Sequence, residues 1–140
     1  MSKFSVRLQD KGRCVITHAI NGSTVTTDLA PEYGGMGRAF SSTDLVASAV
    51  GTCLLTTLDK VLEREGYDSK KLEIKIEKEL SNSPKQIKRV DVKIFHPEPF
   101  SDVLIKKLYN AAGICPVKRS LNSDVDVSIK FVEMNSDIEP

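Results

Sequence analysis

The sequence predicts a single α+β domain over residues 1–140, with antiparallel sheets around one long apolar helix. Two groups of segments alternate apolar and polar residues with the period of half-buried strands. Between them, residues 45–55 are almost purely apolar, as in a buried helix. A second, amphipathic segment at 101–112 separates the later strands. The expected order is therefore three strands, a helix, two strands, two helices and a strand.

The first third of the chain has the pattern of a three-stranded antiparallel sheet. Residues 4–8 and 13–20 alternate, and residues 23–29 return after Asn21-Gly22, a dipeptide typical of tight hairpin turns. A glycine-rich segment at 31–38 follows, and we expect it to be an irregular loop.

The central helix is predicted to begin at Ser41 or Ser42, end near residue 65 and stop at Gly66. Ser41 and Asp44 have the spacing of a capping box, with an aspartate in place of the usual glutamate. Because residues 45–55 are apolar nearly all round, we expect this helix to be buried on every side. A monomer of this size does not readily enclose such a helix, so the sequence predicts a homodimer with the helix near its centre.

The second half of the chain completes the predicted fold. Residues 72–77 and 90–94 alternate as strands with one buried face. An amphipathic helix follows from Ser101 or Asp102 to residue 112, and Gly113 ends it. Pro116 favours a further helical turn over 115–121, and residues 125–131 form the last strand.

Composition limits the classes of function. A formal net charge of +1 and the absence of a basic stripe argue against nucleic-acid binding. Residues 45–58 are interrupted by hydroxyl side chains and fall short of the ~18–20 apolar residues of a membrane span. Three cysteines without an apolar leader indicate the cytoplasm. Two histidines without ligand spacing indicate no metal site, and no cofactor motif is present.

Two of the three cysteines stand in positions suited to chemistry. Cys53 lies within the apolar helix, and Cys115 precedes Pro116 where a helical turn begins, a position that favours a thiolate. Both segments must enter the same core, so the two thiols indicate thiol–disulfide chemistry. The alternative is that each is an inert small apolar side chain, which is our interpretation of Cys14 in its predicted strand.

The glycine loop at 34–37, the helix start and small-residue helix at 41–53, and Cys115-Pro116-Val117 together resemble the OsmC/Ohr family. The resemblance covers essentially the whole chain, and Asp44 makes the broader OsmC-like branch the closer match. It implies an OsmC-like fold in an intertwined, cytosolic homodimer. It also implies a thiol peroxidase that reduces organic hydroperoxides in the oxidative stress response.

The resemblance assigns roles to both cysteines. Cys53 matches the peroxidatic cysteine, which becomes a sulfenic acid, and Cys115 matches the resolving cysteine, which forms a disulfide with it. A small dithiol would then reduce that disulfide, with no metal or other cofactor. The main alternative is a non-catalytic OsmC-like protein that binds a small apolar or thiol ligand at the dimer interface. A cysteine-dependent hydrolase is a more distant one.

The family's charged helpers are replaced in this sequence. Asp10 stands at the position of the family's arginine and Thr43 at that of its glutamate. Arg38, on the glycine loop, is the best candidate for the cation. Asp44 precedes Cys53 by nine residues, which on a straight helix places it on the opposite side and about 13 Å away along the axis. We therefore expect Asp44 to cap the helix, or to act at the site through a bent helix or the partner chain.

Overall fold

The computed structural model describes residues 1–135, 137–138 and 140. It divides into two compact units, Met1–Val46 and Ala47–Pro140, which are described separately below. Each unit contains one three-stranded sheet. The mixed α+β class predicted from the sequence is therefore confirmed, whereas the single domain over residues 1–140 stays a prediction.

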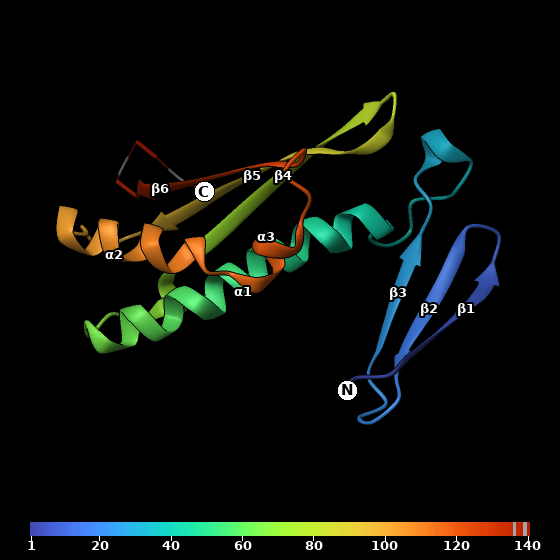
Figure 1. Cartoon of the computed structure of the whole chain (residues 1–140), viewed down its shortest axis with the longest axis horizontal. Helices are drawn as coiled ribbons and strands as arrows, with labels where there is room; N and C mark the ends of the chain where they lie inside the picture. Colours follow the sequence, from blue (N-terminus) through green and yellow to red (C-terminus); the bar gives the residue numbers. More distant parts are fainter. Residues whose placement is uncertain (136, 139) are drawn as a thin grey trace. The chain divides into compact units, whose positions relative to one another are not determined.

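The first unit contains β1 (Phe4–Asp10), β2 (Arg13–His18) and β3 (Thr24–Asp28), paired antiparallel in the order β1-β2-β3 (Figure 1). The predicted hairpin at Asn21-Gly22 is confirmed, with Gly22 in the left-handed conformation that its turn requires. After β3 the loop is more ordered than expected, since it includes the 3-10 helix η1 (Pro31–Tyr33). Gly35 packs so closely on the backbone of Leu29 that any side chain there would collide with it.

The helix α1 (Ser42–Arg64) begins and ends as the sequence predicts. Its last turn is closed by Gly66 at φ 79°. In the single chain one face of α1 is buried and Val46, Thr52 and Thr56 are exposed, so burial on every side, which requires the predicted dimer, stays a prediction. Contrary to the expectation from residues 45–58, α1 is long and apolar enough to cross a membrane by length and composition alone. Core helices of soluble proteins also meet that criterion.

The second unit contains β4 (Glu73–Asn82), β5 (Lys85–His96) and β6 (Asp126–Glu133), with the 3-10 helix η2 (Ser69–Lys71) before β4. Strands β4 and β5 pair antiparallel. Strands β5 and β6 pair parallel, so the prediction of purely antiparallel sheets is wrong. The reason is the crossover between β5 and β6, where α2 (Asp102–Gly113) and α3 (Pro116–Ser120) return the chain to the end at which β5 began.

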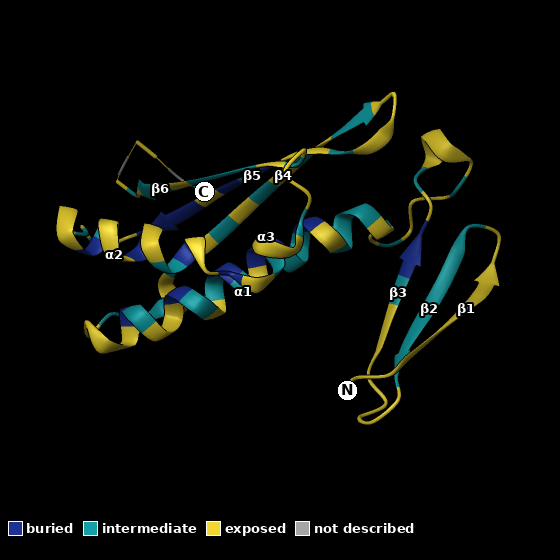
Figure 2. Ribbon diagram, in the orientation of Figure 1, coloured by how far each residue is buried: buried dark blue, intermediate teal, exposed yellow. Residues whose placement is uncertain are grey.

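One hydrophobic core lies between α1, α2 and the sheet of the second unit (Figure 2). The residues that α1 contributes to this core recur at helical spacing. Those that β5 contributes alternate along the strand, on one face of the sheet. Gly51 lets α1 approach β4 closely, since a side chain at that position would collide with Ile76. The buried apolar members are Ala47, Val50, Leu54, Leu58, Leu62, Val90, Val92, Ile94, Leu104, Leu108, Ala112 and Cys115.

Candidate functional site

The structure brings Cys53 and Cys115 together inside the second unit. Their Sγ atoms lie 2.8 Å apart, with Cys115 as the hydrogen-bond donor. This separation exceeds the ~2.05 Å of a disulfide bond, so both cysteines are free thiols. Cys115 is fully buried, whereas Cys53 is half-buried. The prediction that the two thiols enter the same core and meet there is confirmed.

Local structure fixes the position of each thiol. Cys53 follows Gly51 by two residues, and Gly51 packs against Ile76 of β4. Cys115 is the N-cap residue of α3, and its carbonyl accepts a hydrogen bond from the backbone N–H of Arg119 at 3.0 Å. The backbone N–H of Cys115 bonds back to Ala112 at 3.3 Å. The link between α2 and α3 therefore holds the second thiol against α1.

The ionisation of Cys115 differs from the sequence prediction. Burial raises the pKa of the Cys115 thiol, and the hydrogen bond to Cys53 raises it further. Hydrogen bonds from the backbone N–H groups of Lys118 and Val117 act in the opposite direction but do not outweigh burial. The prediction that the helix start favours the Cys115 thiolate is therefore wrong, because desolvation in the core exceeds the effect of a helix of five residues.

Arg38 lies in the first unit, where two carboxylates hold its side chain. Its Nε donates to Asp28 Oδ2 at 2.7 Å, and its backbone N–H donates to the same oxygen at 3.1 Å. Its Nη1 also lies 3.5 Å from Asp10 Oδ2. The hydrogen bond from Arg38 lowers the pKa of Asp28, although burial opposes it. The ion pair likewise raises the pKa of Arg38.

Sequence reasoning did not identify Asp28. Its side chain is fully buried, and within the described residues its Oδ1 atom has no hydrogen-bond partner. The available signal was an aspartate at the end of a strand, immediately before a glycine-rich loop that carries one arginine. That pattern gives no indication of pairing across ten residues, so only the structure links Asp28 to Arg38.

Asp44 lies in the first turn of α1 and caps it. The backbone N–H of Ser41 donates to Asp44 Oδ2 at 2.9 Å, and Ser41 Oγ accepts from the Asp44 N–H at 3.1 Å. This reciprocal pair is a capping box, as the spacing predicts. Thr43 joins the same cluster through a 3.2 Å contact with Ser41 Oγ. A role of Asp44 in chemistry at Cys53 stays a prediction.

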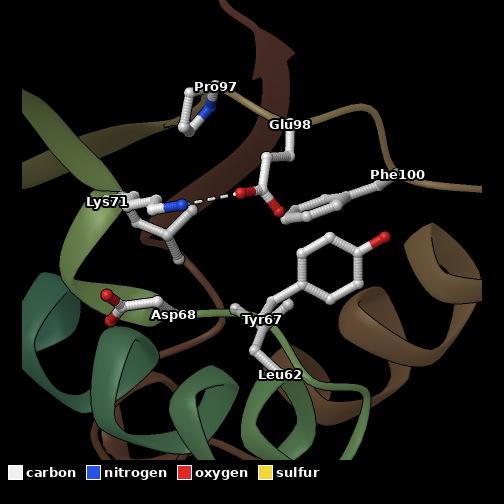
Figure 3. Close-up of a pocket in the computed structure, with 8 residues that line it drawn as sticks. Leu62, Tyr67, Asp68, Lys71, Pro97, Glu98 and Phe100 are labelled. Atoms are coloured by element: carbon white, nitrogen blue, oxygen red, sulfur yellow. Dashed lines mark hydrogen bonds and ion pairs between the residues drawn. The ribbon is translucent and has the colours of Figure 1, made fainter.

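The second unit also has two hollows that lie away from the two thiols. One, beside the end of α1, is lined by the Tyr67 and Phe100 rings and by the Lys71–Glu98 ion pair, whose atoms are 2.8 Å apart (Figure 3). Its volume of about 10 Å³ admits about one water molecule. The other, of about 200 Å³, lies on the sheet and is lined mainly by charged side chains. Neither is lined by Cys53 or Cys115.

No group of three or more metal-ligating side chains is present among the described residues.

Comparisons with known proteins give one consistent family. Residues 35–130 match the family model described as OsmC-like protein. No curated protein matches the sequence. Among solved structures, a protein of Psychrobacter arcticus 273-4, described as an osmotic stress induced and detoxification response protein, is 26% identical. Its TM-score is 0.89, over 94% of this chain and 96% of that one.

Two further structures share the fold at lower identity. An organic hydroperoxide resistance protein OsmC from Legionella pneumophila is 15% identical, with a TM-score of 0.75 over 94% of this chain and 96% of that one. The organic hydroperoxide resistance protein OhrB of Bacillus subtilis is 20% identical, with a TM-score of 0.65 over 94% and 98% of the two chains.

Proposed function

This chain belongs to the OsmC-like protein family, and from that membership we propose that it is a thiol-dependent peroxidase that reduces organic hydroperoxides. The observation that carries the proposal is the 2.8 Å separation of the Cys53 and Cys115 sulfurs. Two free thiols this close can form a disulfide after one of them is oxidised. The names of the Legionella and Bacillus proteins, which refer to organic hydroperoxide resistance, support the substrate class.

In the proposed first step, the Cys53 thiolate attacks the terminal oxygen of the hydroperoxide. A sulfur–oxygen bond forms and the oxygen–oxygen bond breaks. The sulfur loses two electrons and becomes a sulfenic acid, and the organic oxygen takes a proton and leaves as an alcohol. Cys53 is the better attacking thiol because it is half-buried, whereas Cys115 is fully buried.

In the proposed second step, Cys115 attacks the sulfenic sulfur of Cys53. A disulfide forms, the sulfur–oxygen bond breaks and water leaves. A small dithiol then restores both thiols by exchange and becomes a disulfide itself. A reducing cytoplasm would keep the resting pair in the thiol state that the free cysteines have here.

We assign the cation of the proposed site to Arg38, acting in its own chain or in a partner chain. Its Nη1 lies 3.5 Å from Asp10, the position that matches the family's arginine. A guanidinium thus stands beside that position, although a different segment supplies it. Asp44 would contribute chiefly by fixing the start of the Cys53 helix.

A homodimer is part of the proposal. Strand β1 exposes Phe4, Val6 and Leu8 at 60%, 62% and 71%, and alternation puts these three side chains on one face. A contiguous exposed apolar face is typical of a surface that another chain covers. A second copy of this chain is the occupant we propose, consistent with the exposed side of α1.

Hydroperoxide consumption with dihydrolipoamide as reductant tests the function. Wild-type protein should consume tert-butyl hydroperoxide catalytically, and Cys53→Ser should reduce consumption to the uncatalysed rate because the thiol that attacks the peroxide is lost. Cys14→Ser is the matched control and should keep wild-type activity, because Cys14 lies on β2 in the first unit. Equal, slow consumption by wild type and Cys53→Ser would contradict the proposal. Saturable binding of an apolar ligand without turnover would favour a non-catalytic binding protein.

A further inference from the structure

We propose that Cys115 acts before any disulfide forms: its S–H group donates a hydrogen bond to the Cys53 sulfur and so stabilises the Cys53 thiolate. This deepens the proposed function and rests on it for the kinetic consequence. In this role Cys115 first keeps its proton and donates a hydrogen bond to the Cys53 sulfur. It acts as a nucleophile only later, when it attacks the Cys53 sulfenic acid. The hydrogen bond would therefore stabilise the Cys53 thiolate, as a nearby cation does for other reactive cysteines.

The difference in burial between the two sulfurs sets the direction of the hydrogen bond. Cys115 Sγ and Cys53 Sγ lie within hydrogen-bond distance, 2.8 Å apart. A negative charge is less costly on the thiol that water can reach, and Cys53 is half-buried while Cys115 is fully buried. Burial and this same hydrogen bond both raise the pKa of Cys115, so its proton is retained when Cys53 ionises.

In the described part of the second unit, Cys115 is the residue that can stabilise the Cys53 thiolate by a hydrogen bond. Among the described residues of that unit, no other hydrogen bond to Cys53 Sγ is formed, and no ion pair reaches either sulfur. The backbone N–H groups of Val117 and Lys118 act on Cys115 rather than on Cys53. The charged side chains of these four elements are Asp44, Asp59, Lys60, Glu63 and Arg64 of α1, Glu73, Lys75, Glu77, Lys78 and Glu79 of β4, Asp102, Lys106 and Lys107 of α2, and Lys118 and Arg119 of α3.

The retained proton also has a use in the second step. When Cys115 attacks the Cys53 sulfenic acid, the departing hydroxide needs one proton to leave as water. The S–H of Cys115 carries that proton, so the thiol and the sulfenic acid give a disulfide and one water molecule in balance. A thiol that ionised early would lack both the hydrogen bond and this proton.

Two variants at one position separate donation from packing. In a Cys14→Ser background, Cys115→Ser keeps a donor of similar size and Cys115→Ala removes it, and Cys53 is the one thiol left in each. Ultraviolet absorbance of the thiolate, followed against pH, gives the midpoint of Cys53 ionisation. We expect the Cys115→Ala midpoint to lie about one pH unit above that of Cys115→Ser, because a hydrogen bond to a charged group is lost. Equal midpoints, with both variants folded by circular dichroism, would overturn the inference.

A kinetic readout gives a second check. Sulfenic acid formation in a single turnover with tert-butyl hydroperoxide should be about tenfold slower in Cys115→Ala than in Cys115→Ser at pH values below both midpoints. The two rates should converge at high pH, where Cys53 is ionised in both. A rate difference that persists unchanged at high pH would indicate a packing defect and contradict the proposed hydrogen bond.

These results separate the inference from the proposed function. If the midpoints differ as expected but wild type consumes no hydroperoxide with a dithiol, the hydrogen bond stands and the peroxidase proposal fails. If wild type is an active peroxidase and the two midpoints coincide, the function stands and the role of Cys115 as a donor is refuted.

Discussion

Residues Met1–Val46 and Ala47–Pro140 bury different kinds of side chain. In the first unit the two buried residues are Thr27 and Asp28, both polar. In the described part of the second unit, helices and sheet enclose a continuous apolar core that includes Cys115. The second unit therefore has the packing that produces hydrophobic stabilisation within one chain, whereas the first unit is fixed by hairpins and an ion pair.

The difference explains where the chemistry is expected. A rigid apolar core holds two sulfurs at a set distance and keeps one of them protonated by burial. The first unit instead offers charge, in the form of Arg38 and its two carboxylates, and an uncovered apolar strand face on β1. One unit thus presents the thiols, and the other presents the candidate cation and the candidate dimer surface.

The largest effect should come from a cavity in the core of the second unit. Leu54 is fully buried on α1, one residue after Cys53. Leu54→Ala should lower the free energy of unfolding by about 3 kcal/mol, through lost apolar burial and an unfilled cavity. Urea denaturation followed by circular dichroism measures this. A loss below about 0.5 kcal/mol, the size expected at the surface, would show that this face of α1 is not a packed core.

A smaller effect, which depends on concentration, is expected from the apolar face of β1. The double variant Val6→Ser, Leu8→Ser should weaken the proposed homodimer by about 2 kcal/mol per protomer, because two apolar side chains would no longer be buried. Sedimentation velocity should then show dissociation at protein concentrations where wild type is dimeric. Arg7→Ser, between the two on the opposite face of β1, is the matched control and should sediment as wild type does. A wild-type protein that is monomeric at every concentration would contradict the dimer.

The contrast also shows what the sequence can predict. The elements of both units, the Ser41–Asp44 capping box and the meeting of Cys53 with Cys115 all follow from local spacing and from apolar segments that share a core. These signals act over a few residues or require only that apolar faces be buried.

Features set by distant partners were not predictable in the same way. The parallel pairing of β6 with β5 depends on the path of the crossover, which strand periodicity does not report. The raised pKa of Cys115 depends on burial by the whole unit, which outweighs the local helix start. The Asp28–Arg38 pair joins a strand end to a loop, and neither segment alone indicates the other.

The pH dependence of the first unit gives the smallest and most specific prediction. Hydrogen bonds from Arg38 lower the pKa of Asp28 in the folded state. A group with a lowered folded pKa stabilises the fold above its unfolded pKa, about 3.9 for aspartate, and that contribution is lost as pH falls through the lower folded value. Asp28→Asn should therefore lower the melting temperature at neutral pH, and the difference from wild type should shrink below about pH 4.

Asp10→Asn is the matched control, because its carboxylate is exposed and lies 3.5 Å from Arg38 rather than 2.7 Å. Its effect on the melting temperature should be small at every pH, as for exposed ion pairs in general. If Asp28→Asn differed from wild type equally at neutral and acidic pH, its buried side chain would stabilise the first unit by packing alone. The contrast between an apolar second unit and a charge-stabilised first unit would then be lost, because both would depend on packing.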